Sequence, residues 1–382
     1  MSAAVILPLF LLESAIMNIL PVKNNNKLSY NIVIDNSLDH LNESLKSTGR
    51  RWGRALIISD SNVSALYLLN VRSVLESGGL FSEIDSFTFP AGEEQKNLNT
   101  VSSAYEFLIS HHFDRHDIIF ALGGGVTGDL SGFTAASYLR GIDFVQLPTS
   151  LLAMVDSSIG GKTGVDFRSF KNMVGAFYMP VLVYMNLSFL DSLPDNQIRS
   201  GLGEIVKHGL IADRNYLDFI YENADLINHR DKDTLSSIIK RSCEIKKYVV
   251  EKDPKEQGLR AILNFGHTIG HAVEKLSELK LLHGECVSLG SIAASYLSYK
   301  RGTLSENDYH YILDVYDKLG MMTGLKEDFN IKPQDIVDAT HSDKKRDGKK
   351  IRFITLDGIG QARICDDVTD YEIADAAGSI IL

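Results

Sequence analysis

The order of apolar and polar positions divides the chain into two parts of different texture. In the first part, short apolar runs alternate with helical patterns: Ala55 to Ser59, a helical stretch to Ser77, Ile84 to Phe89, a second helical stretch, and Asp117 to Leu122. Such alternation predicts a parallel α/β sheet. After Leu190, helix-period segments dominate at Gln197 to Ile211, Leu235 to Lys252, Thr268 to Leu279 and Cys286 to Lys300. Strand-like runs are few there before Ile351 to Leu356, so this part is predicted to be mainly helical.

A break in the pattern predicts where the two parts separate. Pro194 and Asp195 interrupt it, which places a boundary near Ser188 to Pro194. The expected organisation is an N-terminal extension at 1–16, an α/β domain at 17–190 and a helical domain at 191–382. The extension holds an apolar run, but no Lys or Arg precedes it and Pro8 and Glu13 interrupt it. We therefore expect a short extension before Met17 and no signal peptide or membrane anchor.

Composition limits the partners and the compartment. The 382 residues carry a formal net charge of −10, which argues against nonspecific binding to nucleic acid. An anionic ligand would have to be met by Lys and Arg gathered locally. Three widely spaced cysteines suit a reducing compartment better than a disulfide framework. A cytoplasmic protein without a membrane or nucleic-acid partner is the prediction.

A glycine turn in the first part has the features of a phosphate-binding loop. The apolar run Ile118 to Leu122 leads into Gly123-Gly124-Gly125-Val126-Thr127-Gly128-Asp129 and a helix through Arg140. Glycines let the backbone approach a pyrophosphate, and a helix N-terminus offers free N–H groups to it. The spacing fits G-x-G-x-x-G, with Asp143 about where a ribose-binding acid would lie. A tight turn without a ligand is the alternative for this motif alone.

Two further segments favour a nucleotide site and a Rossmann-like domain. Asp60 directly follows one predicted strand, and Gly92-Glu93-Glu94-Gln95-Lys96 follows the strand that ends at Phe89. Both lie at carboxyl ends of predicted strands, where open α/β sheets usually bind ligands.

Histidines in the second part suggest a metal site. His267 and His271 stand at i and i+4 on a helix that His267 would begin, and His283 opens the next helical stretch. Glu204 shares a helix face with Lys207. One carboxylate and two imidazoles would leave coordination positions open, as catalytic zinc sites do. For each histidine alone, a hydrogen-bonded cap or core position is the alternative.

Basic residues accompany these segments. Lys162 is the most distinctive, because it follows Gly160-Gly161 in a segment of small residues where a purely solubilising charge is unexpected. The others, each of which alone suits a solvated surface, are Arg140, Lys171, Lys207, Lys246, Arg260 and the run Lys344-Lys345-Arg346.

Taken in order, several long motifs resemble the 3-dehydroquinate synthases, within the sugar phosphate cyclase superfamily. They are Pro148 to Thr163 with its Gly-Gly-Lys-Thr end, Lys171 to Phe177, Gly201 to Glu204, Gly258 to Arg260 with the double-histidine run, and Leu282 to Glu285. The resemblance runs from about Asn18 to the C-terminus. It implies conversion of 3-deoxy-arabino-heptulosonate 7-phosphate to 3-dehydroquinate and phosphate, with transient NAD reduction, in the shikimate pathway of aromatic amino acid biosynthesis.

The resemblance also assigns residues. It implies that zinc or cobalt is bound by Glu204, His267 and His283, with His271 on the substrate and phosphate side. The NAD site would comprise Asp60, Glu93, Lys96, Gly124, Gly125, Val126, Asp129, Thr149, Ser150, Lys162 and Lys171; Asp143 does not correspond to the ribose acid. Substrate contacts would comprise Arg140, Asp156, Lys162, Asn172, Lys207, Lys246, Arg260, Asn264 and His271, with Lys344 or Lys345 reaching back to the substrate. Arg140 would serve a neighbouring subunit of a homodimer.

Three other functions compete with this one. A sister sugar phosphate cyclase would share the metal ligands but depart at the Gly-Gly-Lys-Thr segment, Arg260 and Asn264. A metal-dependent polyol dehydrogenase would carry a Thr-Gly-Ser loop where Leu151-Leu152-Ala153-Met154 stands. A NAD- or metal-sensing binding protein would not need the full set of charged candidates.

Overall fold

The computed structural model describes residues 17–168, 170–278, 280–326, 329–344 and 352–381. The predicted extension at 1–16 lies outside this part of the chain. By their contacts, the described residues form two compact units, one ending at Leu193 and the other beginning at Pro194. Among the described helices, none is both long and apolar enough to cross a membrane.

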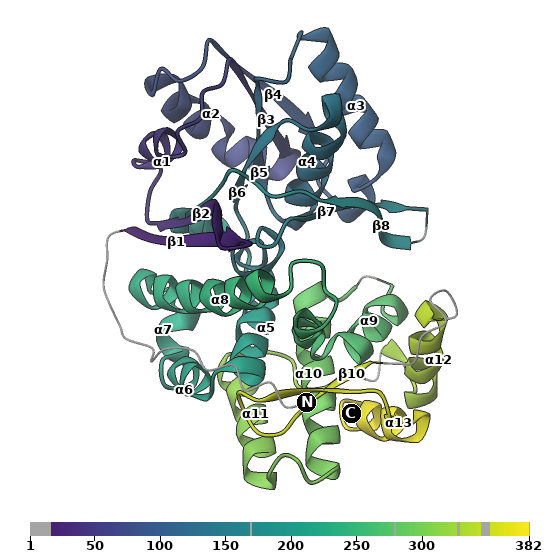
Figure 1. The fold of residues 1–382 in the computed structure, drawn as a ribbon. Helices are drawn as coiled ribbons and strands as arrows, with labels where there is room; N and C mark the ends of the chain where they lie inside the picture. Colours follow the sequence, from purple (N-terminus) through teal and green to yellow (C-terminus); the bar gives the residue numbers. More distant parts are fainter. Residues whose placement is uncertain (1–16, 169, 279, 327–328, 345–351, 382) are drawn as a thin grey trace. The chain divides into compact units, whose positions relative to one another are not determined.

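The first unit is built on a mainly parallel sheet (Figure 1). In its described part, seven strands lie in the order β1-β2-β9-β6-β5-β3-β4, and only β1 and β2 pair antiparallel. The bounds are Met17–Asn24 (β1), Lys27–Asp35 (β2), Arg54–Asp60 (β3), Glu83–Phe89 (β4), Ile118–Gly123 (β5), Asp143–Pro148 (β6) and Leu182–Asn186 (β9). This confirms the predicted parallel α/β sheet.

Helices pack on this sheet in two pairs (Figure 1). Helix α1 (Leu41–Ser47) lies beside α2 (Ser61–Ser77), and α3 (Leu98–Ser110) lies beside α4 (Gly125–Ser137). Apolar side chains of β3 and β5, such as Leu56, Ile58 and Ile119, are fully buried in the core that α3 and α4 cover. Because consecutive strands β4 and β5 lie on opposite sides of β3, the sheet has a switch point between β3 and β5, where ligands of such folds bind.

A hairpin that the sequence pattern did not predict lies between β6 and β9 in the chain. Strands β7 (Lys162–Phe167) and β8 (Phe170–Phe177) pair antiparallel, with an irregular register between Val165 and Phe167. The segment contains many small residues, and its sequence therefore shows no clear alternation of apolar and polar residues that would predict strands. The hairpin therefore carries Lys162 and Asn172 on strands and not in a loop.

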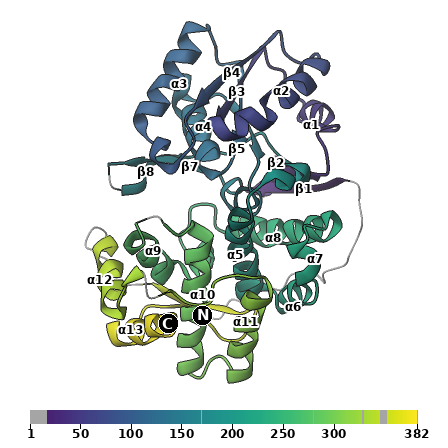
Figure 2. The same ribbon diagram turned by 180° about the vertical axis from the view of Figure 1, so that it is seen from behind.

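The second unit is mainly helical, as predicted, and α10 lies at its centre (Figure 2). Most residues of α10 are buried, and it packs against α5, α9, α11 and α13. A small hairpin of β10 (Phe353–Leu356) and β11 (Ala362–Cys365) also contacts it. The helices are Asp195–Ala212 (α5), Arg214–Glu222 (α6), Ala224–Asn228 (α7), Lys232–Lys252 (α8), His267–Leu276 (α9), His283–Lys300 (α10), Glu306–Lys318 (α11), Pro333–Lys344 (α12) and Asp370–Gly378 (α13).

Candidate metal centre and nucleotide site

Three histidines of the second unit meet at the beginnings of two helices. The ligand nitrogens of His267, His271 and His283 all lie within 4.8 Å of one another. Glu204, on α5, places Oε1 at 3.7 Å from Nε2 of both His267 and His283. The predicted carboxylate and imidazoles therefore converge. The position of His271 suits either a further ligand or a substrate contact, so its predicted substrate-side role stays a prediction.

Glycines at helix crossings explain why these segments meet. A Cβ on Gly203 would collide with the backbone oxygen of Gly284, and a Cβ on Gly284 would collide with that of Ser200. Helices α5 and α10 can therefore approach only with glycine at both positions. The crossing places Glu204, next to Gly203, beside His283, next to Gly284.

In this cluster, burial and the neighbouring charges have strong and often opposing effects on the pKa values of the side chains. Glu204 is fully buried and forms an ion pair with the ammonium of Lys207, one turn along α5. Burial disfavours its ionised form, but Lys207 and the two imidazoles outweigh this and hold its pKa well below the usual range. Burial, reinforced by the charge of Lys207, lowers the pKa of His267. For His283, burial is outweighed by the attraction of the Glu204 and Glu274 carboxylates, which raises its pKa to about 9.

Three further predicted substrate contacts lie in the same unit. Arg260 is 2% exposed; its backbone N–H donates to Asp253 Oδ2 at 3.0 Å and its Nη1 donates to the carbonyl of Pro254 at 2.8 Å. Asn264 is exposed and donates to Glu256 Oε1 at 2.8 Å. Lys246, on α8, is also buried. The side chains of Lys344 and Lys345 lie outside the described residues, so the choice between them stays open.

The candidate nucleotide residues gather at the carboxyl ends of the parallel strands in the first unit. Asp60 ends β3, Gly124 and Gly125 join β5 to α4, and Thr149 and Ser150 follow β6. Asp60 caps α2 by accepting from the N–H groups of Asn62 and Val63, and its other oxygen accepts from the Thr127 hydroxyl at 3.2 Å. That bond joins β3 to α4 at the switch point of the sheet. Val126 lies in the first turn of α4.

A buried ion pair lies next to this turn. Lys96 Nζ is 2.7 Å from Asp129 Oδ2 and 3.9 Å from Glu93 Oε1. Burial raises the pKa of Asp129 more than the attraction of Lys96 lowers it. For Lys96, the carboxylates of Asp129 and Glu93 outweigh burial and raise its pKa, so Lys96 stays charged.

The remaining candidates of the first unit lie on or near the hairpin. Lys162, Lys171 and Asn172 are exposed, and Asn172 adopts a left-handed backbone with φ of 55°. Its N–H donates to Asp166 Oδ1 at 2.7 Å, while the Asp166 N–H donates to the carbonyl of Lys96 at 2.8 Å. Arg140 is also exposed with positive φ, and Asp156 is half-buried in the turn of Ala153–Ser157.

Two residues correct or extend the sequence interpretation. Asp143, which the glycine fingerprint suggested for ribose, begins β6 and accepts from Arg50 and Trp52 at 2.5 and 2.8 Å. As the first residue of β6, it lies at the amino ends of the parallel strands, whereas Asp60, Gly124 and Thr149 lie at their carboxyl ends. Glu274, which the sequence interpretation missed, lies 3.3 Å from His283 Nδ1. Its place seven residues after His267, on the same helix face, could have indicated it.

Comparison with solved structures defines the class. A 2-epi-5-epi-valiolone synthase from Streptomyces hygroscopicus, with NAD+ and Zn2+ bound, superposes with a TM-score of 0.84 at 29% identity and covers 94% of this chain and 98% of its own. A 2-deoxy-scyllo-inosose synthase complexed with carbaglucose-6-phosphate, NAD+ and Co2+ gives 0.84 at 27% identity, covering 94% and 99%. The fold is that of the sugar phosphate cyclases.

Sequence comparison narrows the class to one family. Models of the 3-dehydroquinate synthase N-terminal and C-terminal regions match residues 86–200 and 201–346. The 3-dehydroquinate synthase of Acetivibrio thermocellus is 43% identical over 326 residues, which are 85% of this chain and 89% of that protein. The chain belongs to the 3-dehydroquinate synthase family.

Proposed function

We propose that this protein converts 3-deoxy-arabino-heptulosonate 7-phosphate to 3-dehydroquinate and phosphate, a step of the shikimate pathway of aromatic amino acid biosynthesis. The observation that carries the proposal is the convergence of Glu204, His267 and His283 in a chain 43% identical to a 3-dehydroquinate synthase. The sister cyclases that it resembles in fold are more distant in sequence, at 29% and 27% identity.

The residues of the cluster fit a divalent metal. Glu204 Oε1 is buried and accepts no hydrogen bond from the described residues, while two imidazole nitrogens face it. Carboxylate and imidazole ligands suit zinc and cobalt, and three protein ligands leave positions for substrate oxygens. We assign the metal to Glu204, His267 and His283.

The turn between β5 and α4 fits the pyrophosphate of NAD. A Cβ on Gly125 would lie 3.2 Å from the Ser157 hydroxyl, so glycine keeps the backbone there open. Gly124 gives α4 no side-chain cap, which leaves its first N–H groups for a ligand. When bound, NAD supplies a hydride acceptor that is regenerated within the cycle, and the metal supplies a Lewis acid.

The side chains of this chain then bind and orient the substrate. Arg260, held by Pro254, has the planar donor geometry that suits a carboxylate. Lys162, Asn172, Lys207 and His271 are the candidates for handling the phosphate and its proton. We infer from the family resemblance that an oxygen of the leaving phosphate itself takes the proton during elimination, so no strong protein base is assigned.

Phosphate release tests the function. The purified protein is supplied with 3-deoxy-arabino-heptulosonate 7-phosphate, NAD and zinc or cobalt, beside a chelated sample, while NADH absorbance is followed. We expect metal-dependent phosphate release without net NADH. No release from metal-loaded protein would favour a sister cyclase, and steady NADH formation with another polyol would favour a dehydrogenase.

We also propose a cytoplasmic homodimer. The three cysteines are buried and form no disulfide with one another, which supports a reducing compartment. Leu139, Met173 and Phe177, in the segments that carry Arg140 and Asn172, are 45%, 59% and 54% exposed, which supports a partner surface. Light scattering should give about twice the chain mass of 42.3 kDa, and the monomer mass would contradict the dimer.

A further inference from the structure

Glu274 is a buried carboxylate that the roles above leave unused. It lies on α9, two turns after His267, and is 7% exposed. Its Oε2 is 3.3 Å from His283 Nδ1. Burying a carboxylate is costly unless it is paired or hydrogen-bonded, so its place beside an imidazole needs a physical reason.

The two histidines assigned to the metal have the same arrangement. Each directs Nε2 toward Glu204 Oε1, at 3.7 Å in both cases. Each has an oxygen acceptor at Nδ1, which is the carbonyl of Phe265 at 3.1 Å for His267 and Glu274 at 3.3 Å for His283. Both rings therefore direct Nε2 toward the proposed metal site and Nδ1 toward a hydrogen-bond acceptor on the side away from that site.

This arrangement selects one tautomer of each ring. An imidazole that binds a metal through Nε2 carries its proton on Nδ1, and an acceptor there fixes both the tautomer and the ring plane. A carboxylate acceptor also makes the ring a stronger ligand than a carbonyl does, because it is charged.

We propose that Glu274 is a positioning residue that holds His283 with its proton on Nδ1 and its Nε2 toward the metal. The proposal rests on the proposed metal centre and extends it by one carboxylate. It also explains why α9, and not only its first residue, is part of the site: the helix presents His267 as a ligand and Glu274 as the support of a ligand from α10.

Metal affinity tests this role. Zinc dissociation constants are measured by competition with a chromophoric chelator for the wild type, Glu274→Gln and Glu274→Ala. We expect the variants to bind zinc about 10- to 100-fold more weakly, the range found for loss of such outer partners, with Ala the more affected. The visible spectrum of the cobalt-loaded variants should also change, because the ligand field at the metal would change.

The matched control is Glu278→Gln, an acid-to-amide change just beyond the end of α9 at an exposed residue that faces Lys280. It should leave zinc affinity and the cobalt spectrum unchanged. If Glu274→Ala does not fold, the zinc affinity and cobalt spectrum of Glu274→Gln alone test the proposal, provided that the metal-free melting temperature of this variant matches that of the wild type.

Unchanged zinc affinity and an unchanged cobalt spectrum in folded Glu274→Gln and Glu274→Ala would overturn the proposal. Failure of the proposed function would be distinct, because the wild type would then bind zinc with Glu274-dependent affinity but release no phosphate.

Discussion

At the scale of single residues, the balance of charge around Glu204 is the central feature of the second unit. Glu204 and Lys207 are 0% and 1% exposed, so neither charge is stabilised by water. Removing one member of a buried pair leaves the other uncompensated, which costs far more than losing a surface pair. A bound metal cation would supply part of the positive charge with which Lys207 compensates the carboxylate of Glu204.

Lys207→Met should therefore destabilise the metal-free protein by about 3 kcal/mol and the zinc-loaded protein by clearly less. Urea unfolding with and without zinc measures both values. Lys247→Met is the matched control, because Lys247 and Glu251 form a partly exposed pair at 3.6 Å and its loss should cost under about 1 kcal/mol. An equal loss with and without zinc would contradict the idea that metal and Lys207 share the compensation of Glu204.

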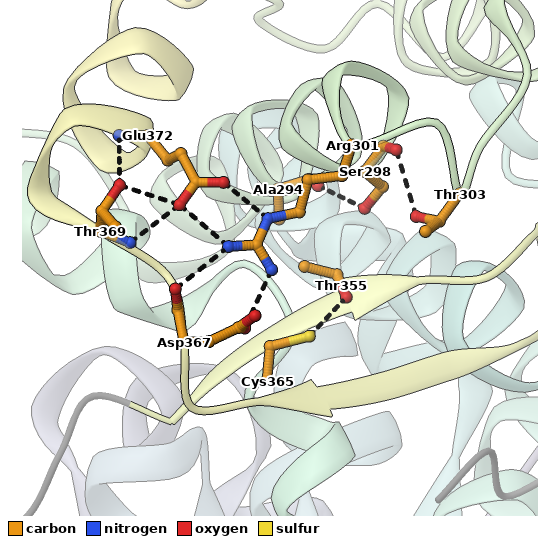
Figure 3. A network of polar contacts seen from close by, with 9 residues as sticks. All are labelled: Ala294, Ser298, Arg301, Thr303, Thr355, Cys365, Asp367, Thr369 and Glu372. Atoms are coloured by element: carbon orange, nitrogen blue, oxygen red, sulfur yellow. Dashed lines mark hydrogen bonds and ion pairs between the residues drawn. The ribbon is translucent and has the colours of Figure 1, made fainter.

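At the scale of elements, one arginine links the C-terminal end of α10 to the segment that begins α13 (Figure 3). Arg301 donates from Nε and Nη2 to the two oxygens of Glu372 at 2.7 and 2.9 Å, and from Nη1 to Asp367 at 3.0 Å. Glu372 also accepts from the backbone of Thr369, closing the capping box of α13. The same carboxylate thus caps one helix and binds the end of another, which stabilises the core around α10.

This network predicts a pH dependence. The Arg301 guanidinium and the Thr369 bonds outweigh burial and lower the pKa of Glu372 from 4.5 to about 2. Its stabilisation is therefore complete above pH about 4.5 and is lost as the pH falls toward 2. After solvent screening we expect Glu372→Gln to cost about 1 kcal/mol at pH 7, with the difference from wild type shrinking by pH 3.

Urea unfolding of both proteins across that pH range measures the difference. Glu306→Gln, an exposed acid in the first turn of α11, is the control and should show no comparable change. A difference that stays constant down to pH 3 would exclude the ionised carboxylate of Glu372 as its source.

What the sequence could predict was local. The 3.6-residue period and the apolar runs predicted β3, β4, β5 and the helices α9 and α10, which begin at His267 and His283 as expected. The pairing of β7 with β8 depends on contacts between segments without alternating polarity, so it was missed. Asp143 was suggested by spacing alone, and spacing does not say at which end of the parallel strands a residue lies.

At the scale of the molecule, the convergence of the candidate site could not be derived from spacing. It depends on two helices crossing at Gly203 and Gly284, which are far apart in the sequence. Family resemblance supplied what periodicity could not, namely that Glu204 and His283 belong to one site. Neither periodicity nor family resemblance indicated Glu274, because its role depends on the orientation of the His283 ring.

Two ligands assigned to two units should stabilise the protein through separate residues. At about a hundredfold excess over the dissociation constant, either zinc or NAD contributes roughly 2.7 kcal/mol, or a rise of about 5 to 10 °C in the melting temperature. His283→Ala should abolish the rise with zinc and keep the rise with NAD, and Gly125→Val should do the reverse. Differential scanning calorimetry of each variant with each ligand measures the four shifts. A zinc shift that survives His283→Ala would remove this residue from the ligand set, and an NAD shift that survives Gly125→Val would place the pyrophosphate away from the β5–α4 turn.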